Sequence, residues 1–307
     1  PGFSAPVYEV DYAPYKPRCD VMLHGNAYAP NDAFVKRLTV SLQVGSWRKS
    51  FSVVGDREWV YSALIGIGPN APQPFQVMPI TYERAFGGTD DRHPESNKHD
   101  AYLPNPIGRG YHYLLSREYV DNAPLPNTEA LNQAIRKPNG RYQPMAFGPI
   151  GRNWAPRYQL AGTYDQHWLD HVFPFLPADF QDAYYQCAPE DQQMDYLKGG
   201  ETVKLIHLTP QGETQFQLPT VDVPVTFFLK HGDSQQVQAV ADTLILEPEA
   251  ERLMITWRTH LPLKKNMFEV PQVLVGKKSR GWWRARQLGK TYYPSLAALD
   301  KAREESE

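Results

Sequence analysis

The chain has 307 residues, of which 41% are hydrophobic and 21% charged, and its formal net charge at pH 7 is -2. This composition is typical of a folded globular protein and excludes a disordered one, and the near-balanced charge excludes a global attraction to nucleic acid or to an anionic membrane. No apolar run approaches the roughly 18 residues of a membrane-spanning helix. The two cysteines, Cys19 and Cys187, are too few for a disulfide scaffold, so we expect reduced thiols in a cytoplasmic protein.

The first regular elements are predicted to be strands. Residues 21–28 form a first strand after a turn-rich lead at 13–17. The clearest pattern is a hairpin that turns at Gly45-Ser46 and keeps a period of two on both sides of the turn. Its apolar positions are Leu38, Val40, Leu42, Val44, Phe51 and Val53. One face of this hairpin is therefore expected to be buried and the other wet.

The middle of the chain loses this periodicity. From about residue 66 to 177, Pro and Gly recur every few positions among many aromatic residues, which predicts an ordered, packed loop system. Two short helices are expected in it. One covers 128–135 with Asn127 as its cap, and the other covers 166–172 with Asp165 as its cap.

After these loops, two short helices are expected at 179–186 and 190–197, separated by Pro189 and stopped by Gly199-Gly200. Strand patterns then return, and a solvent-facing helix is predicted at 295–305. The predicted strands are 203–208, 215–218, 223–229, 237–246, 252–257 and 270–275.

Runs of strands without alternating helices favour an antiparallel scaffold over a parallel α/β sheet. We expect a mainly β, antiparallel β-sandwich-like fold with a long Pro- and Gly-rich loop insertion and a few short helices. One domain is expected to span 1–307. Its predicted sub-regions are N-terminal strands (1–65), the loop-rich insertion (66–200), C-terminal strands (201–290) and a terminal helix (291–307).

One candidate for chemistry is the pair His167 and His171, which are four residues apart on one helix face, a spacing that suits zinc. A third ligand would come from Asp165 or His207. The metalloprotease pattern needs Glu directly after the first His, whereas this chain has Trp168. A metal-dependent hydrolase is thus one alternative, and ordinary surface or core histidines are the favoured interpretation.

A second polar cluster follows Gly87-Gly88. Oxygen-rich clusters attract hard cations, but this spacing matches no calcium loop, and a solvated loop explains it equally well. Its members are Asp90, Asp91, His93, His99 and Asp100.

Three arginines stand in the most distinctive blocks: Arg84, Arg109 and Arg157. Glu83-Arg84 and Asp165 offer acid–base groups, yet sequence separation alone does not pair such groups. No nucleophile elbow, P-loop or dinucleotide fingerprint accompanies them. We favour a structural role, in which the guanidinium forks bind loop carbonyls and carboxylates where no strand ladder does.

The C-terminal region is basic and carries Trp282-Trp283. Basic residues among aromatics suit nucleic-acid or glycan binding, but they equally suit a protein interface or a solvated edge whose Trp pair packs on a sheet. Possible partner-binding residues here are Trp282, Trp283, Arg284 and Arg286, and the near-neutral chain argues against nucleic acid.

Several blocks together resemble a bacterial family of domains of unknown function encoded beside type VI secretion spike and effector genes. They include Asp11-Tyr12-Ala13-Pro14-Tyr15-Lys16-Pro17, Gly55-Asp56-Arg57 and Trp257-Arg258-Thr259-His260-Leu261-Pro262. The central blocks contribute Tyr82, Glu83, Arg84, Phe86, Gly87, Gly88, Asn105, Pro106, Gly108, Arg109, Trp154, Arg157, Gly162, Thr163, Tyr164 and Asp165.

The resemblance implies a cytoplasmic effector chaperone or adaptor that loads a cognate toxic effector onto the spike, a VgrG trimer with or without a PAAR cone. It supplies no catalytic residues, so we expect a non-enzymatic protein that uses no cofactor or metal. Family members usually carry a further β-rich segment, which we expect ahead of Pro1. The middle of the chain would then be a docking platform, on which aromatics give contact area with little rotamer entropy to lose.

Overall fold

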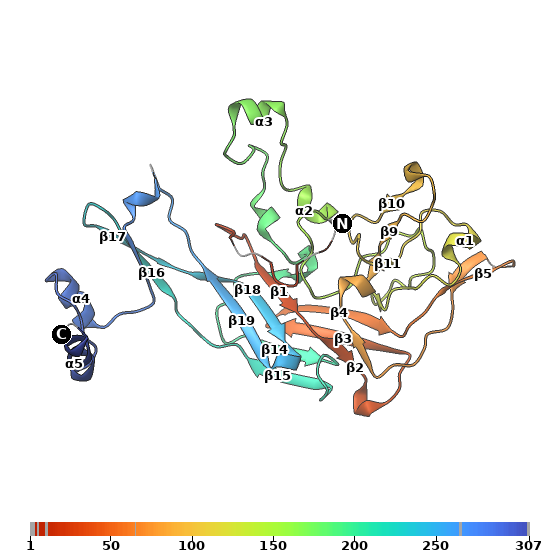
Figure 1. Ribbon diagram of the computed structural model, residues 1–307. Coiled ribbons are helices and arrows are strands. Elements are labelled where there is room, and N and C mark those ends of the chain that lie inside the picture. The colour runs from red at the N-terminus through yellow and green to blue at the C-terminus, as the bar shows by residue number, and fades with distance from the viewer. Residues whose placement is uncertain (1–3, 5, 10–11, 65, 264–265, 306–307) are drawn as a thin grey trace. The chain divides into compact units, whose positions relative to one another are not determined.

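The computed structural model describes residues 4, 6–9, 12–64, 66–263 and 266–305. It confirms a mainly β architecture with several antiparallel sheets (Figure 1). By their contacts the residues form two compact units. Unit 1 comprises Pro1–Thr220 and Val240–His260, and unit 2 comprises Val221–Ala239 and Leu261–Glu307.

The larger sheet of unit 1 is built on the predicted hairpin, which the structure confirms. Leu38, Val40, Leu42 and Val44 are buried on one face, and Gly45 makes the turn with a φ of +56°. The strand order is β12-β4-β3-β14-β15. The strands are β3 Arg37–Val44, β4 Trp47–Val54, β12 Thr128–Glu129, β14 Thr202–Ile206 and β15 Glu213–Gln217.

The second sheet of unit 1 has the order β13-β1-β18-β19, from β1 Cys19–Leu23, β13 Gln193–Met194, β18 Val240–Glu247 and β19 Arg252–Arg258. Its β1 and β18 pair in parallel, an exception to the expected antiparallel pairing. Val21 and Leu244 belong to the same buried cluster as Val40 and Phe51. The two sheets therefore share one core, as in a sandwich.

The remaining strands of unit 1 are short two-stranded ribbons, most of them in the loop-rich region. Their order of pairing is β2 with β7, β5 with β6, β8 with β11 in parallel, and β9 with β10. Their bounds are β2 Asn26–Tyr28, β5 Trp59–Ser62, β6 Gly66–Pro69, β7 Val77–Pro79, β8 Phe86–Gly87, β9 Thr89–Asp90, β10 Asp100–Ala101 and β11 Arg109–Gly110.

The helices of unit 1 are short: α1 Arg117–Val120, α2 Ala155–Tyr158 and α3 Gln166–His171. The prediction of a helix at 166–172 is confirmed, and the Asp165 carboxylate accepts from the Trp168 N–H as its cap. For 179–186 the structure has only a 3-10 turn, Asp182–Tyr185.

Two predicted helices are wrong. At 128–135, Thr128 and Glu129 instead pair with β4. At 190–197, a 3-10 turn leads into β13, which pairs with β1. In both places ladder hydrogen bonds to a distant strand override local propensity.

Unit 2 has a three-stranded antiparallel sheet, β17-β16-β20, and two helices. Its elements are β16 Pro224–Phe228, β17 Ser234–Gln238, β20 Gln272–Val275, α4 Arg280–Gln287 and α5 Leu296–Glu304. The terminal helix is confirmed, with Ser295 as its cap. Two expectations are corrected: α4 lies where strands were predicted, and the single strand at 237–246 is divided between β17 and β18. Within the described part of the chain, no helix has the length and apolar character to cross a bilayer.

Candidate functional site

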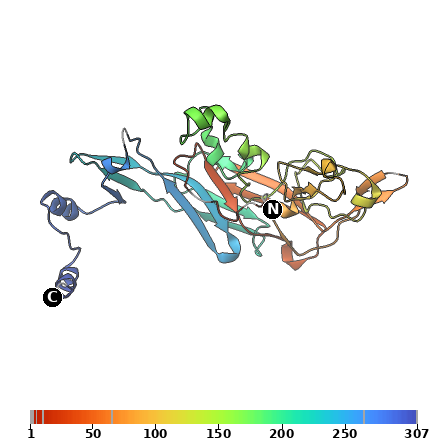
Figure 2. The ribbon, with the colours of Figure 1, turned by 45° about the horizontal axis from the view of Figure 1, so that its top comes forward.

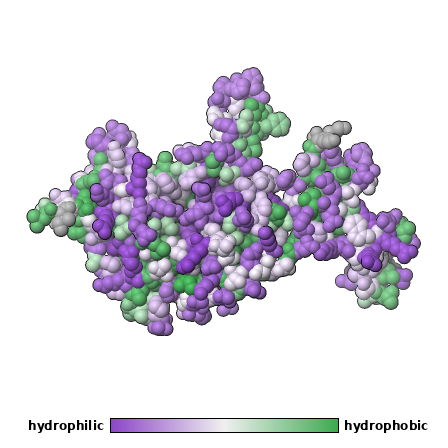
Figure 3. Space-filling model, turned by 180° about the vertical axis from the view of Figure 1, so that it is seen from behind, coloured by the Kyte–Doolittle hydropathy of each residue, from purple (hydrophilic) through white to green (hydrophobic). Residues whose placement is uncertain are grey.

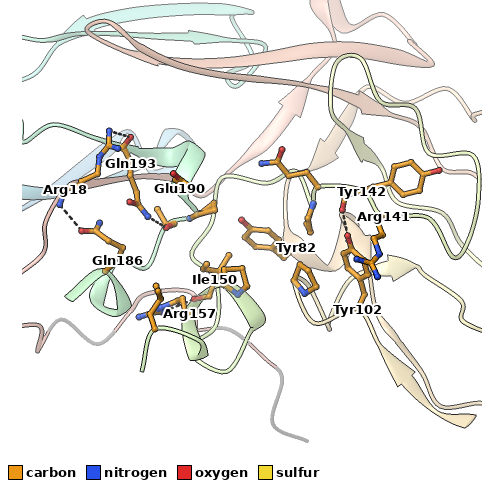
Figure 4. Close-up of a pocket in the computed structure, with 18 residues that line it drawn as sticks. Arg18, Tyr82, Tyr102, Arg141, Tyr142, Ile150, Arg157, Gln186, Glu190 and Gln193 are labelled. Atoms are coloured by element: carbon orange, nitrogen blue, oxygen red, sulfur yellow. Dashed lines mark hydrogen bonds between the residues drawn. The ribbon is translucent and has the colours of Figure 1, made fainter. Parts of the chain in front are cut away.

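The distinctive sequence blocks meet around a cavity of about 730 Å³ in unit 1 (Figure 4). Tyr82, Ile150 and Arg157 reach it from three different blocks. The wall of the cavity is lined by three tyrosines, several prolines and the arginines Arg18 and Arg141. We call this cavity the central groove, and the irregular chain at residues 79–157 the loop network.

Buried side chains, in addition to the short ladders of β8–β11 and β9–β10, hold the loop network together. Asn105, fully buried, donates from Nδ2 to the carbonyls of Tyr82 (2.8 Å) and Phe86 (3.1 Å). Gln192 donates to Val21 and Phe147 in the same way. Such bonds satisfy the backbone groups that a region with little strand pairing would otherwise leave orphaned.

The three block glycines in this region, Gly87, Gly88 and Gly108, hold close approaches of the chain. Gly87 has a φ of +151°, and an added Cβ would lie 2.0 Å from the carbonyl oxygen of Asn105. At Gly88 the Cβ would lie 2.7 Å from the oxygen of Gly108. Pro106 also contributes its carbonyl, which accepts from the Thr89 hydroxyl.

The aromatic residues of the blocks are mostly core. Phe86, Phe147 and Trp154 are fully buried, and Tyr82 is 5% exposed and packs edge-on against Trp154. Tyr164 is the exception at 52% exposed. The interpretation of these rings as a docking surface therefore does not hold for the buried four.

Arg157 acts as a structural fork. It is 2% exposed, and its guanidinium donates to the carbonyls of Ile150 and Tyr184 and to the carboxylate of Glu9. Arg84 and Arg109 instead share the side chains of Asn127 and Asp56. Glu83 is exposed on a 3-10 turn.

Tyr82 brings a buried polar group without a partner to the central groove. Its hydroxyl is buried without a hydrogen-bond partner among the described residues. Burial, with a smaller effect of Asp191, raises the pKa of Tyr82, so the hydroxyl stays protonated as a donor. Around it, Arg18 donates to Gln186 and Gln193, and Tyr102 donates to the Tyr142 carbonyl (Figure 4).

A second feature of unit 1 is an excursion at residues 162–177, which we call the arm; it carries α3 away from the sheets (Figures 1 and 2). At its base, Thr163 donates from its backbone and hydroxyl to the Asp179 carboxylate (3.0 and 2.7 Å). Gly162 bends the chain there with a φ of +81°. Large apolar side chains are exposed on it: Leu169 54%, Phe173 63%, Phe175 75% and Leu176 50%.

The space-filling view shows hydrophobic residues on one side of the projecting lobe that the arm forms (Figure 3). Trp168 orders it from within: its ring packs edge-on against Tyr164 and Phe173, and its Nε1 donates to the Phe175 carbonyl. Sequence reasoning missed Phe173 and Phe175. The available signal was an apolar run, Val172-Phe173-Pro174-Phe175-Leu176, inside an otherwise polar loop.

His167 and His171 do lie together on α3, with ring centres 5.0 Å apart. Asp165 uses its carboxylate to cap the helix, and the ring of His207 contacts the Thr39 carbonyl. Within the ranges that the structure describes, no group of three or more His, Cys, Asp or Glu side chains is placed to hold a metal ion.

The polar cluster at 90–100 makes protein contacts instead. Asp90 accepts from the Tyr113 and Leu114 N–H groups, and Asp100 accepts from the Tyr111 hydroxyl. His99 contacts the carbonyl of His93, and Asp91 is exposed. Hydrogen bonding within the loops thus accounts for most of these residues.

In unit 2 the Trp282–Trp283 pair packs edge-on, with Trp283 6.0 Å from Phe228. The Arg286 guanidinium stacks 3.6 Å from the centre of the Phe228 ring and donates to Gln272. Arg284 is exposed. Both tryptophans are half-buried, so this cluster is first of all the packing of α4 on the sheet of unit 2.

Comparison with known proteins gives one match. A family model described as an uncharacterized protein conserved in bacteria (DUF2169) matches residues 1–258. No curated protein matches the chain, and no solved structure does. The match includes the loop network, the central groove and the arm, and it stops before β20 and the two helices of unit 2.

Proposed function

The chain belongs to this bacterial family, and on that premise we propose that it is a cytoplasmic adaptor that binds a cognate type VI effector and promotes its loading onto the VgrG/PAAR spike. The sequence resemblance supplies the connection to effector loading. The observation that carries the proposal is the exposed apolar arm, because an adaptor without chemistry of its own needs a surface that another protein covers.

The arm has the composition and burial of a protein-binding surface. Phe173 and Phe175 are 63% and 75% exposed, and they are two residues apart in the sequence. Leu169 and Leu176, in the same segment, are also exposed. Full burial of one such side chain is worth roughly 1.5–3 kcal/mol, and clustered aromatic anchors dominate binding energies at interfaces. Contiguous exposure of this kind marks interaction sites.

The arm is also held by contacts of its own, which need no partner. The bonds from Thr163 to Asp179 fix its base, and Trp168 fixes its tip. A segment that is already ordered loses less entropy on binding. This supports the arm as a docking element rather than a linker.

The first experiment removes the gene in the native host. Secretion of one cognate effector is expected to fail while the apparatus continues to secrete its other substrates. The adaptor and that effector are expected to co-purify without spike proteins. Intact secretion of every effector contradicts the proposal.

A second experiment locates the contact. In the variant Phe173→Ser/Phe175→Ser, co-purification with the effector is expected to fall at least tenfold. The matched control is Phe34→Ser/Leu64→Ser, which removes side chains of unit 1 that are 71% and 96% exposed but lie outside the arm. Equal losses in both variants contradict a specific role for the arm.

A further inference from the structure

A second cavity in unit 1, of about 350 Å³, gathers three arginines from three separate sequence blocks. Arg57 follows Gly55-Asp56, Arg84 ends the 3-10 turn Tyr82–Arg84, and Arg109 stands in β11. Asp56 and Glu58 also line it. We call this cavity the arginine pocket.

The charge of Arg57 is already paired within the fold, although its buried Nε has no hydrogen-bond partner among the described residues. Arg57 is 7% exposed and donates from Nη2 to the Pro126 carbonyl and, at 2.8 Å, to the buried carboxylate of Glu129. Arg57 therefore forms the floor of the pocket rather than a free cation.

Arg84 and Arg109 are in the opposite situation, because they share their acceptors. Both donate to Oδ1 of Asn127, and both lie within 3.7 Å of the same carboxylate oxygen of Asp56. Each guanidinium has five N–H donors. In the described part of the chain, Nε and Nη2 of Arg84 and Nε and Nη1 of Arg109 have no acceptor.

Arg84 and Arg109 also share their ion-pair partner. Arg84 and Arg109 have side chains 32% and 24% exposed and face one carboxylate, Asp56, which is itself 64% exposed. Burial and the nearby charge of Arg84 lower the pKa of Arg109, and Asp56 opposes them only in part. Among the described residues, Asp56 is the carboxylate within ion-pair distance of both guanidinium groups, and Glu58 lines the pocket without an ion pair to either of them.

The shared ion pairs and the acids of the wall together favour one kind of ligand. Asp56 and Glu58 repel a dianionic phosphate more strongly than a monoanionic carboxylate. Planar guanidinium forks bind a carboxylate through two parallel hydrogen bonds. The volume of about 350 Å³ is at the small end of ligand sites, which suits one side chain or one chain end.

We propose that the arginine pocket binds one carboxylate of a polypeptide, either an acidic side chain or a C-terminus, through Arg84 and Arg109. The inference rests on the proposed function only for the source of that polypeptide, the effector. It assigns to the family blocks around Arg84 and Arg109 a recognition role beside their structural one.

Peptide titration tests the chemistry without any effector. The probes are three short alanine peptides: one with a free C-terminus, one capped at both ends with a central Glu, and one capped with a central Gln. The Nε–H signals of Arg84 and Arg109 are followed by NMR, and a shift with millimolar affinity is expected for the first two probes only. The tighter of these two identifies the source of the carboxylate.

Variants separate recognition from folding. Arg84→Gln is expected to abolish the peptide-induced shift of the remaining Arg109 Nε–H signal, and Arg136→Gln, at an exposed arginine, is expected to leave the shifts of both signals unchanged. Asp56→Asn keeps the acceptor for Asn127 and removes the competing charge. It is therefore expected to tighten carboxylate binding at least about threefold, the opposite of what structural damage produces.

Four results overturn the inference: no shift with either carboxylate peptide, equal shifts with the Gln peptide, tighter binding of inorganic phosphate than of the peptides, or weaker binding in Asp56→Asn. Failure of effector co-purification with intact peptide binding would instead refute the proposed function alone.

Discussion

The loop network and the arm have similar amino-acid compositions, but they differ in which side chains are buried. Both are rich in Pro and aromatic residues. In the loop network, Phe86, Phe147 and Trp154 are fully buried, whereas Phe173 and Phe175 in the arm are 63% and 75% exposed. In the loop network the aromatic side chains pack in the core and hold irregular backbone in place. In the arm, Phe173 and Phe175 are exposed to solvent.

The difference teaches that aromatic loop composition does not by itself mark a binding surface. Where buried amides such as Asn105 satisfy the backbone and glycines permit close approach, the loop is a core. Where the chain is fixed at its base and by Trp168 but large apolar side chains remain exposed, the loop is available for binding. Substitutions in the two regions are therefore expected to have opposite consequences for stability and for partner binding.

The largest expected effect is at Gly87. Gly87→Ala places a Cβ 2.0 Å from the Asn105 carbonyl oxygen, so we expect a loss of more than about 4 kcal/mol in the free energy of unfolding. Gly66→Ala is the matched control, since Gly66 has a φ of +81° but nothing within 4 Å. It is expected to lose about 1–2 kcal/mol. Urea denaturation measures both, and equal losses contradict the close-approach argument.

Asn105→Ala is expected to have the next largest effect. It removes the donor to the carbonyls of Tyr82 and Phe86 inside the protein, at about 3 kcal/mol for two buried acceptors. The control Asn139→Ala alters an exposed amide of the same region and is expected to change stability by less than about 0.5 kcal/mol. An Asn105 variant as stable as its control would mean that the loops do not depend on this amide.

The loop network also predicts a dependence on pH. His112 is buried with its Nδ1 2.5 Å from the Arg92 guanidinium and 4.0 Å from Asp90. Burial, and then Arg92, lower the pKa of His112 from 6.5 to about 4, with Asp90 opposing them. The neutral ring favours the folded state, so its contribution is complete above pH 6.5 and is lost as the pH falls towards about 4.

Denaturation curves across that window measure this loss. We expect His112→Gln to lose less stability between pH 6.5 and about 4 than the parent protein does. Parallel curves for the two proteins would rule out His112 as the source of the acid sensitivity.

The smallest effect on stability is expected in the arm. Phe175 is 75% exposed, so Phe175→Ser is expected to change the free energy of unfolding by no more than about 0.5 kcal/mol. Effector binding by the same variant is expected to weaken by at least tenfold, about 1.4 kcal/mol. Destabilisation as large as that of Asn105→Ala would show that the ring is part of the core and not of a binding surface.

The sequence by itself determined the local elements with strong periodicity or capping. Alternation fixed the hairpin of β3 and β4, because a period of two places one face in the core. Asp165 and Ser295 marked the starts of α3 and α5, because a cap satisfies N–H groups within its own turn. The identity of the family blocks was also legible, as the match over residues 1–258 bears out.

The tertiary structure alone decided which of these residues meet. Thr128 and Gln193 became strand because β4 and β1 lie beside them, and Arg84 met Arg109 because Asn127 and Asp56 draw the two guanidinium groups together. The burial of Trp154 and the exposure of Phe175 were likewise not readable from residue type. The burial of a side chain and the pairing of a strand depend on segments that are distant in sequence. A local sequence pattern does not determine which distant segments come into contact.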